Sequence, residues 1–431
     1  MKRDVAVDGK APYAPKDPRR EERNVLDRAK RVMKKRLPRP LVRRYEQFSY
    51  DRSLPKTAKE QARRDASGLP AQIPSHEDCI GAAMTWLRRA QDATASRDGG
   101  VARHYSLIGG WATSYPETTG YIIPTFLASN GETPASEADA ARARRMLDWL
   151  VSIQFADGAF QAGLIDAVPR VPTTFNTGQI LIGLAAGVEE FGDAAYRDAM
   201  HGAASWLRDS LDDDGCWRRH PSPFTKPGEK VYETHVSWGL FEAERVAPNQ
   251  GYGEAGLRQV DWALTRQAAN GWFADCCLSS PTIPLTHTLG YALRGILEAY
   301  RLSEDPKYLA ASKVTADAML ELLQEDGFLA GRFDAQWQAA VDWSCLTGTC
   351  QVAICWLMLY GITGDPRYLD AATRANTYVK RTVDLDGPPE TRGAVRGSFP
   401  ISGQYGRYEY LNWAAKFFID SLRLERALTA G

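Results

Sequence analysis

The sequence of 431 residues has no long uninterrupted apolar segment and little cysteine. No run of about 18 apolar residues occurs, so no transmembrane helix is predicted. The first 16 residues lack the apolar core of a secretory signal. The seven cysteines are odd in number and have no zinc-ligand spacing. Free thiols and a cytoplasmic location are therefore expected.

Nucleotide and metal motifs are also missing. There is no Walker loop, and no G-x-G-x-x-G segment follows a strand pattern. We expect no cofactor and no metal. Hydrophobic residues make up 44% and charged residues 25% of the chain, which is typical of a globular protein with a sizeable core.

Net charge is zero, from 53 Lys+Arg and 53 Asp+Glu, which argues against a general nucleic-acid binder. The charge is uneven, because residues 19–44 hold 12 Lys/Arg against 3 Asp/Glu. Residues 24–37 form an amphipathic helix pattern. It either lies on an anionic membrane surface or packs on the protein or a partner. Residues 48–71 are expected to be a polar linker, so residues 1–72 form a basic arm and linker.

The rest of the chain, residues 73–431, repeats with a period of about 57 residues. Asp-Gly or Asn-Gly turns recur with glycines at 99, 158, 215, 271, 327 and 387. Before each turn we expect an amphipathic outer helix that stops at the glycine. After each turn a helix that is apolar on nearly every side begins, near positions 116, 174, 232, 285, 345 and 408. The first five copies share a Thr-containing first turn, and the sixth, at residues 409–412, departs from it. Asp305-Pro306 and Asp365-Pro366 mark the starts of two outer helices.

Six such hairpins predict an all-α fold, a closed (α/α)6 toroid, with an open solenoid as the rival arrangement. Few strands are expected; residues 395–401 are the candidate. In a closed ring, the first turns of the inner helices meet at one end, where polar residues form a rim suited to a binding site.

The rim is rich in carboxylates and contains two histidines. Each carboxylate has a structural alternative, because acidic residues are favoured at helix starts, and each histidine could be structural. As a set they suggest acid–base chemistry. The candidate catalytic residues are Glu117, Glu233, Asp342, His235 and His287.

Aromatic and amide side chains lie among these residues and suit the stacking and hydrogen bonding of a sugar. Lys416 is either paired with a carboxylate or positioned to meet an anionic substrate. The candidate binding residues are Trp111, Tyr115, Tyr121, Asn176, Gln179, Tyr232, Trp238, Tyr291, Trp337, Trp343, Tyr405, Glu409, Asn412, Trp413 and Lys416.

The acidic run at residues 212–214 needs a separate explanation, because terpene cyclases are toroids with similar repeat motifs. Their D-x-D-D and D-D-x-x-D motifs are not matched here, since Leu211, Cys216 and Trp217 occupy the required positions. We interpret the three aspartates as a solvated turn. A terpene cyclase or prenyltransferase-like toroid stays an alternative.

Three segments carry a family resemblance: residues 110–125 (GWATSYPETTGYIIPT), 285–291 (LTHTLGY) and 405–418 (YGRYEYLNWAAKFF). They resemble a family associated with bacterial exopolysaccharide and capsule biosynthesis, from about residue 75 onward. The toroid is more distantly similar to unsaturated glucuronyl hydrolases, polysaccharide lyases and glucuronyl C5-epimerases. The resemblance implies a polysaccharide or oligosaccharide substrate.

Two chemistries fit this context. Glycoside hydrolysis would use Glu117 and Glu233, with Asp342 in reserve. Uronate lysis or epimerisation would use His235, His287 or a tyrosine as the base. Hydrolysis is favoured because carboxylates are numerous and cations are few. A non-catalytic glycan-binding scaffold is the third possibility. Contact of the arm, residues 19–44, with the inner face of the membrane would suit a growing polysaccharide.

Overall fold

The structure is a computed structural model that describes residues 50–128, 134–226 and 228–430. The chain divides into two compact units, residues 1–59 and residues 60–431, and the helical ring belongs to the second unit. The basic segment 19–44 and its predicted helix lie outside the described residues. Part of the expected linker is helical, because α3 spans Lys56–Ala66.

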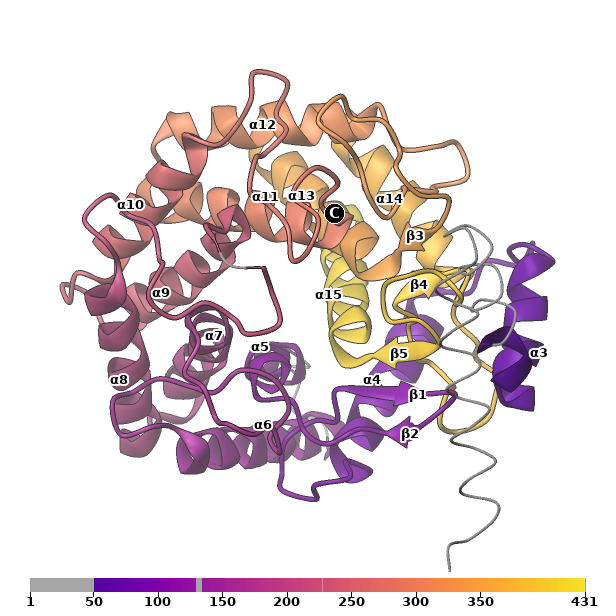
Figure 1. The fold of residues 1–431 in the computed structure, drawn as a ribbon, viewed down its shortest axis with the longest axis horizontal. Coiled ribbons are helices and arrows are strands. Elements are labelled where there is room, and N and C mark those ends of the chain that lie inside the picture. Colours follow the sequence, from indigo (N-terminus) through magenta and orange to yellow (C-terminus); the bar gives the residue numbers. More distant parts are fainter. Residues whose placement is uncertain (1–49, 129–133, 227, 431) are drawn as a thin grey trace, which may run out of the picture. The chain divides into compact units, whose positions relative to one another are not determined.

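Twelve helices form six hairpins around a ring (Figure 1), which confirms the predicted toroid. The outer helices are α4 (His76–Asp92), α6 (Pro134–Ile153), α8 (Ala194–Ser210), α10 (Tyr252–Leu264), α12 (Pro306–Leu320) and α14 (Pro366–Lys380). The inner helices are α5 (Pro116–Leu127), α7 (Thr174–Phe191), α9 (Thr234–Val246), α11 (Thr286–Ser303), α13 (Leu346–Thr363) and α15 (Asn412–Thr429). Each inner helix packs on the next, and α15 returns to α4 and α5. The ring is therefore closed, and the open solenoid is excluded.

Outer helices bury one face. In α8 the buried residues, from Tyr196 through Ala199, Met200 and Ala203 to Leu207, recur at helical spacing. The predicted caps of α12 and α14 are confirmed, because the Asp305 and Asp365 side chains accept the backbone N–H two residues later.

Inner helices are buried on nearly every side. In the described part of the chain, only α13 is long and apolar enough to cross a membrane, and 72% of that segment is buried inside the protein. The inner helices also approach one another closely. A Cβ added to Gly183 of α7 would lie 2.2 Å from the carbonyl oxygen of Gly120 in α5. Neighbouring inner helices thus meet backbone to backbone.

The Asp/Asn-Gly turns differ from the prediction, because each outer helix ends five to seven residues before its glycine. The glycine instead closes a turn, as where the Gly327 N–H donates to the Gln324 carbonyl at 2.9 Å. Five of the six glycines have positive φ, from 82° to 105°. Gly387 does not have a positive φ, because Pro388 follows it and favours an extended conformation.

These turns link successive repeats. A Cβ on Gly327 would lie 2.2 Å from the Arg374 carbonyl oxygen of the next outer helix. The same close approach joins Gly158 to Gly202 and Gly215 to Arg258. The 57-residue spacing therefore reflects contacts between neighbouring hairpins.

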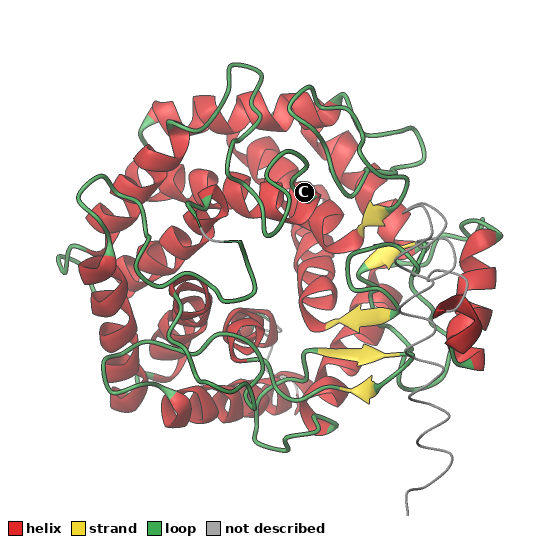
Figure 2. Ribbon diagram, in the orientation of Figure 1, coloured by secondary structure: helices red, strands yellow, loops and turns green. Residues whose placement is uncertain are grey.

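Short strands lie on one side of the ring (Figure 2). β1 (His104–Ser106) pairs antiparallel with β2 (Gly110–Trp111) and with β5 (Glu409–Leu411). β3 (Ser344–Cys345) pairs with β4 (Ser398–Phe399), which lies in the expected segment 395–401. The β1–β5 pair joins the first and last hairpins and was not predicted.

Replacing Gly183 by alanine is expected to lower the free energy of unfolding. The added methyl group would meet the backbone oxygen of Gly120. Overpacking costs about 1–3 kcal/mol, which exceeds the gain of about 1 kcal/mol in helix propensity. Urea denaturation measures the change. Gly81→Ala on α4 is the matched control, because nothing lies within 4 Å of its added Cβ. Similar values for both variants would contradict the close packing.

Candidate active site

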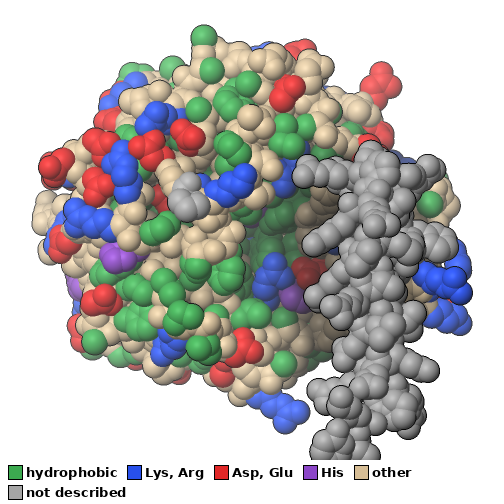
Figure 3. Space-filling model, viewed as in Figure 1, with side chains coloured by type: hydrophobic (Ala, Val, Ile, Leu, Met, Phe, Trp, Pro, Cys, Tyr) green, Lys and Arg blue, Asp and Glu red, His purple; other side chains and the backbone are tan. Residues whose placement is uncertain are grey.

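A cavity of about 530 Å³ opens at the end of the ring where the inner helices begin. Figure 3 shows a hollow in this face, with hydrophobic side chains inside it and charged and histidine side chains at its wall. The lining residues come from the first turns of the inner helices and from the loops before them. The cavity brings together nine of the predicted residues: Tyr115, Glu117, Tyr121, Asn176, Tyr232, His287, Tyr291, Tyr405 and Trp413.

Glu117 is the buried carboxyl group of this cavity. It lies in the first turn of α5 and is 8% exposed. Burial raises its pKa from 4.5 to about 7, although the Tyr115 hydrogen bond and the Arg103 charge oppose the increase. The Tyr115 hydroxyl donates to Oε2 at 2.7 Å. Near neutral pH this group can therefore either donate or accept a proton.

His287 lies on another wall, in the first turn of α11. Its Nδ1 is 2.7 Å from Oε1 of Gln351, which can only accept a hydrogen bond. With Oε1 facing the ring, the proton lies on Nδ1, and Nε2 is left as the acceptor. Burial lowers the pKa of His287 to about 4, against the effect of the Gln351 hydrogen bond. At neutral pH this side chain is uncharged.

Aromatic rings form much of the remaining wall. Phe175 packs edge-on against Tyr232 and Tyr291, each with a centroid distance of 5.3 Å. The Trp413 indole N–H donates to the Tyr405 hydroxyl at 2.8 Å. Ring faces beside hydroxyl groups suit a substrate that combines apolar ring faces with many hydroxyls.

Arg103 and His104 line the cavity but were missed by the sequence analysis. The Arg103 guanidinium pairs with Glu409 at 3.1 Å and lies 5.1 Å from the centre of the Trp413 ring. Burial, together with the Arg103 charge, lowers the pKa of His104 to about 4, although Glu409 opposes this. Strand pairing of β1 with β5 brings these groups together from some 300 positions apart in the sequence.

Two loops complete the lining, and they also carry residues that were not predicted. Asp166 accepts a hydrogen bond from the Thr113 hydroxyl at 3.0 Å. Phe224 is 67% exposed and lines the cavity beside Gly163. On α7, Asn176 is buried in this lining, and its Nδ2 has no hydrogen-bond partner.

The other predicted catalytic residues do not line this cavity. Glu233 follows Tyr232 in the sequence but is buried away from the lining, and burial raises its pKa to about 8 against the opposing charge of Lys230. Asp342 is exposed and, with Trp343, lines a separate hollow of about 720 Å³. Glu233 and Asp342 lie near helix starts as predicted, but neither side chain lines the cavity that contains Glu117.

His235, Gln179 and Lys416 belong to the buried interior instead. His235 Nδ1 is 2.6 Å from Oε1 of Gln179, and burial holds the pKa of His235 well below its usual value. Lys416 is 3% exposed and pairs with Asp420, so the paired alternative is the correct one. Burial lowers the pKa of Lys416, and Asp420 opposes this. Asn412 is also structural, because its amide donates to the Ala102 carbonyl and the Thr118 hydroxyl.

Four predicted tryptophans also lie outside the lining. Trp111 packs against Trp86, with ring centroids 5.5 Å apart. The indole N–H of Trp238 donates to Glu242 at 2.6 Å, and that of Trp337 donates to the Asn270 carbonyl at 2.9 Å. Trp343 is buried beside the separate hollow. These rings are therefore used for packing between elements.

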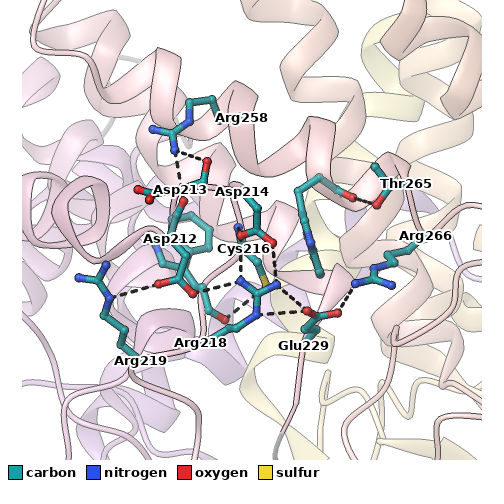
Figure 4. A network of polar contacts seen from close by, with 12 residues as sticks. Asp212, Asp213, Asp214, Cys216, Arg218, Arg219, Glu229, Arg258, Thr265 and Arg266 are labelled. Atoms are coloured by element: carbon teal, nitrogen blue, oxygen red, sulfur yellow. Dashed lines mark hydrogen bonds and ion pairs between the residues drawn. The ribbon is translucent and has the colours of Figure 1, made fainter.

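The acidic run forms an exposed turn after α8, as predicted (Figure 4). Arg218 contacts Asp214 at 2.7 Å, Asp212 at 3.1 Å and Glu229 at 2.6 Å. The Arg218 hydrogen bond lowers the pKa of Asp214 to about 2. Arg219 binds Asp212 at 3.2 Å. The carboxylates of Asp212 and Asp214 are thus paired with arginines. In the described part of the chain, no group of three or more His, Cys, Asp or Glu side chains could hold a metal ion.

No family model matches the chain, and no curated protein matches it in sequence. Solved structures match its fold. An unsaturated glucuronyl hydrolase from Bacillus sp. GL1 has a TM-score of 0.65 at 16% identity, over 82% of this chain and 98% of that one. A cellobiose 2-epimerase from Bacillus thermoamylovorans gives 0.62 at 12%, over 80% and 97%. A family 76 glycoside hydrolase from a Bacteroides thetaiotaomicron strain gives 0.61 at 13%, over 83% and 78%. The chain shares the six-hairpin toroid fold of these enzymes.

Removing the Tyr115 hydroxyl is expected to raise the pKa of Glu117 further. The hydroxyl donates to the ionised carboxylate and so stabilises the charged form. Its loss should raise the pKa by about one pH unit. Carboxyl-carbon NMR titration of Tyr115→Phe measures this. Tyr121→Phe is the control, because Tyr121 lines the same cavity but contacts the Tyr291 hydroxyl. A lower pKa in Tyr115→Phe would contradict the assignment.

Proposed function

We propose that this protein is a carbohydrate-active enzyme that cleaves or modifies a glycan in the central cavity. One observation carries the proposal: Glu117, with a pKa of about 7, lies in a cavity lined by aromatic rings and hydroxyl groups. A carboxyl group whose pKa lies near neutral pH is suited to proton transfer. The shared fold supports this class, because the three solved structures are an unsaturated glucuronyl hydrolase, a cellobiose 2-epimerase and a glycoside hydrolase.

Glycoside hydrolysis is the reaction that these residues support best. The Glu117 carboxylic acid would donate its proton to the glycosidic oxygen as the bond to the anomeric carbon breaks. A second carboxylate would accept a proton from the attacking water or bond to that carbon itself. Asp166 takes this second role in our proposal in place of Glu233, because Asp166 lines the same cavity and Glu233 does not.

Proton abstraction from carbon is the second candidate, as in uronate epimerisation or lysis. The observation in its favour is that His287 lines the cavity as a neutral imidazole whose Nε2 can act as the base. Arg103 would place positive charge near a uronate carboxylate, although Glu409 already pairs with it. A pKa of about 4 makes His287 a weak base, and we therefore rank this reaction second.

The decisive experiment incubates the full-length protein with neutral and uronate-containing polysaccharides in D2O. Reducing ends, ultraviolet absorbance of unsaturated uronate and deuterium uptake are followed together. We expect new reducing ends without unsaturation, and a loss of about 10²–10⁴-fold in Glu117→Gln. Activity should also fall about tenfold per pH unit above the Glu117 pKa of about 7, because the acid form reacts.

Glu233→Gln is the matched control, because it removes a buried carboxyl group with a raised pKa that does not line the cavity. It should keep most of the activity. Unsaturation or deuterium uptake, lost in His287→Ala but kept in Glu117→Gln, would move the reaction to proton abstraction. Binding without turnover across the panel would leave a glycan-binding scaffold.

We further propose that the substrate is a bacterial exopolysaccharide or capsule chain, handled at the cytoplasmic face of the membrane. The family resemblance of residues 110–125, 285–291 and 405–418 supports the substrate class. The basic segment 19–44 supports the location, because it has nine more cationic than acidic residues.

Deleting residues 1–44 is expected to release the protein from anionic vesicles while the toroid keeps its fold. Each basic residue near an anionic surface contributes about 1 kcal/mol, so the loss in binding should be large. Vesicle sedimentation measures it, with circular dichroism to check the fold. Neutral vesicles are the control and should bind neither protein. Equal binding of both proteins to anionic vesicles would refute a membrane role for the arm.

A further inference from the structure

A second cavity, of about 610 Å³, lies outside the ring in the second unit. One wall is formed by residues 61–78, which include the end of α3 and the start of α4. The other is formed by residues 380–399, from the end of α14 to β4. It shares no lining residue with the central cavity. Its volume suits a small molecule.

Lys380 is the unusual residue of this cavity. It ends α14, lines the cavity and is only 6% exposed. Its ammonium group has no hydrogen bond and no ion pair with any described residue. Since the side chain lines the cavity, its ammonium group is available to an anion bound there.

Arg396 supplies a second buried cation. It is 6% exposed, and one guanidinium nitrogen pairs with Asp65 at 3.0 Å. Its Nε lies buried with no hydrogen-bond partner. Asp65 does not neutralise Lys380 as well, because its other oxygen accepts the Ile401 N–H at 2.7 Å.

The remaining charged groups of the lining are engaged elsewhere or exposed. Asp384 pairs with Arg64 at 3.4 Å and accepts the Asp386 N–H at 3.0 Å. Asp78 accepts from the Ser75 hydroxyl at 2.8 Å. The Arg381 Nε donates to the Pro70 carbonyl, and the Asp386 side chain is exposed. The unmatched donors are therefore those of Lys380 and Arg396.

We propose that this outer cavity binds the oxyanion group of a sugar-sized molecule, with Lys380 as the anchoring cation and the Arg396 Nε–H as a second donor. Carboxylate and phosphate share the required chemistry, so a uronic acid and a sugar phosphate are the two sources. The proposal is independent of the reaction in the central cavity. One chain segment, residues 396–411, contributes to both cavities, because Phe399 lines the outer cavity and Tyr405 lines the central one.

The test titrates the full-length protein with glucuronate, glucose 1-phosphate and neutral glucose in phosphate-free buffer, using calorimetry. We expect at least one of the two anions to bind and glucose not to bind. Affinity for that anion should fall at least tenfold in Lys380→Met and should be kept in Lys380→Arg. Glu117→Gln should bind it as the wild type does, which separates this cavity from the central one.

Lys380→Met is expected to fold, and its thermal midpoint without ligand should be no lower than that of the wild type, because the substitution removes no hydrogen bond or ion pair with a described residue. Three results would overturn the proposal: neither anion binds the wild-type protein, Lys380→Met binds the anion unchanged, or Glu117→Gln abolishes its binding. The preferred anion identifies the source, a uronate or a sugar phosphate.

Discussion

Backbone-to-backbone contact between neighbouring inner helices is the constraint on which the rest of this structure depends. A Cβ on Gly183 would lie 2.2 Å from the Gly120 carbonyl oxygen, and one on Gly239 would lie 2.4 Å from that of Gly178. On α11, Gly295 meets the Thr234 carbonyl in the same way. The four helices α5, α7, α9 and α11 thus touch without intervening side chains and form part of a narrow ring whose first turns lie at the same end. The position and size of the central cavity follow from this contact.

The same close packing removes water from the carboxyl groups at the rim. The pKa of Glu117 rises from 4.5 to about 7 and that of Glu233 from 4.5 to about 8. At pH values between the ordinary pKa of 4.5 and the folded-state pKa of each glutamate, the folded state holds more protons than the unfolded state. The resulting stabilisation is complete below pH 4.5 and is lost as pH rises through the folded-state pKa. At neutral and higher pH these groups lower stability, and the packing of the ring must offset that loss. The same burial gives Glu117 its usable proton.

The sequence predicted the fold well because the repeat is encoded in local patterns. Five inner helices begin within two residues of their expected positions, since apolar periodicity and the Thr-containing first turn recur in each of those five. The sixth, α15, begins four residues late because Glu409–Leu411 pairs as β5 with β1. Such pairing depends on residues far apart in the chain, which no local pattern reports. Arg103 and His104 were missed for the same reason.

The candidate site was predicted less completely, because a position in a first turn does not fix the direction of its side chain. Tyr232 lines the cavity and its neighbour Glu233 does not, although both belong to the same turn. Asp166 and Phe224 lie in loops without periodicity, so no sequence pattern indicates that they line the cavity.

The two buried lysines show how spacing and partners separate a structural charge from a binding group. Lys416 was considered for an anionic substrate, yet Asp420 lies one helical turn further along α15 and neutralises it. Lys380 ends its helix, so Asp384 at i+4 lies beyond α14, and it pairs with Arg64 instead. Asp65 is bound to Arg396 and to the Ile401 N–H. A buried lysine with an acidic residue at i+4 in the same helix can be explained within that helix. One at a helix end requires a partner from elsewhere, and around Lys380 the described protein supplies none.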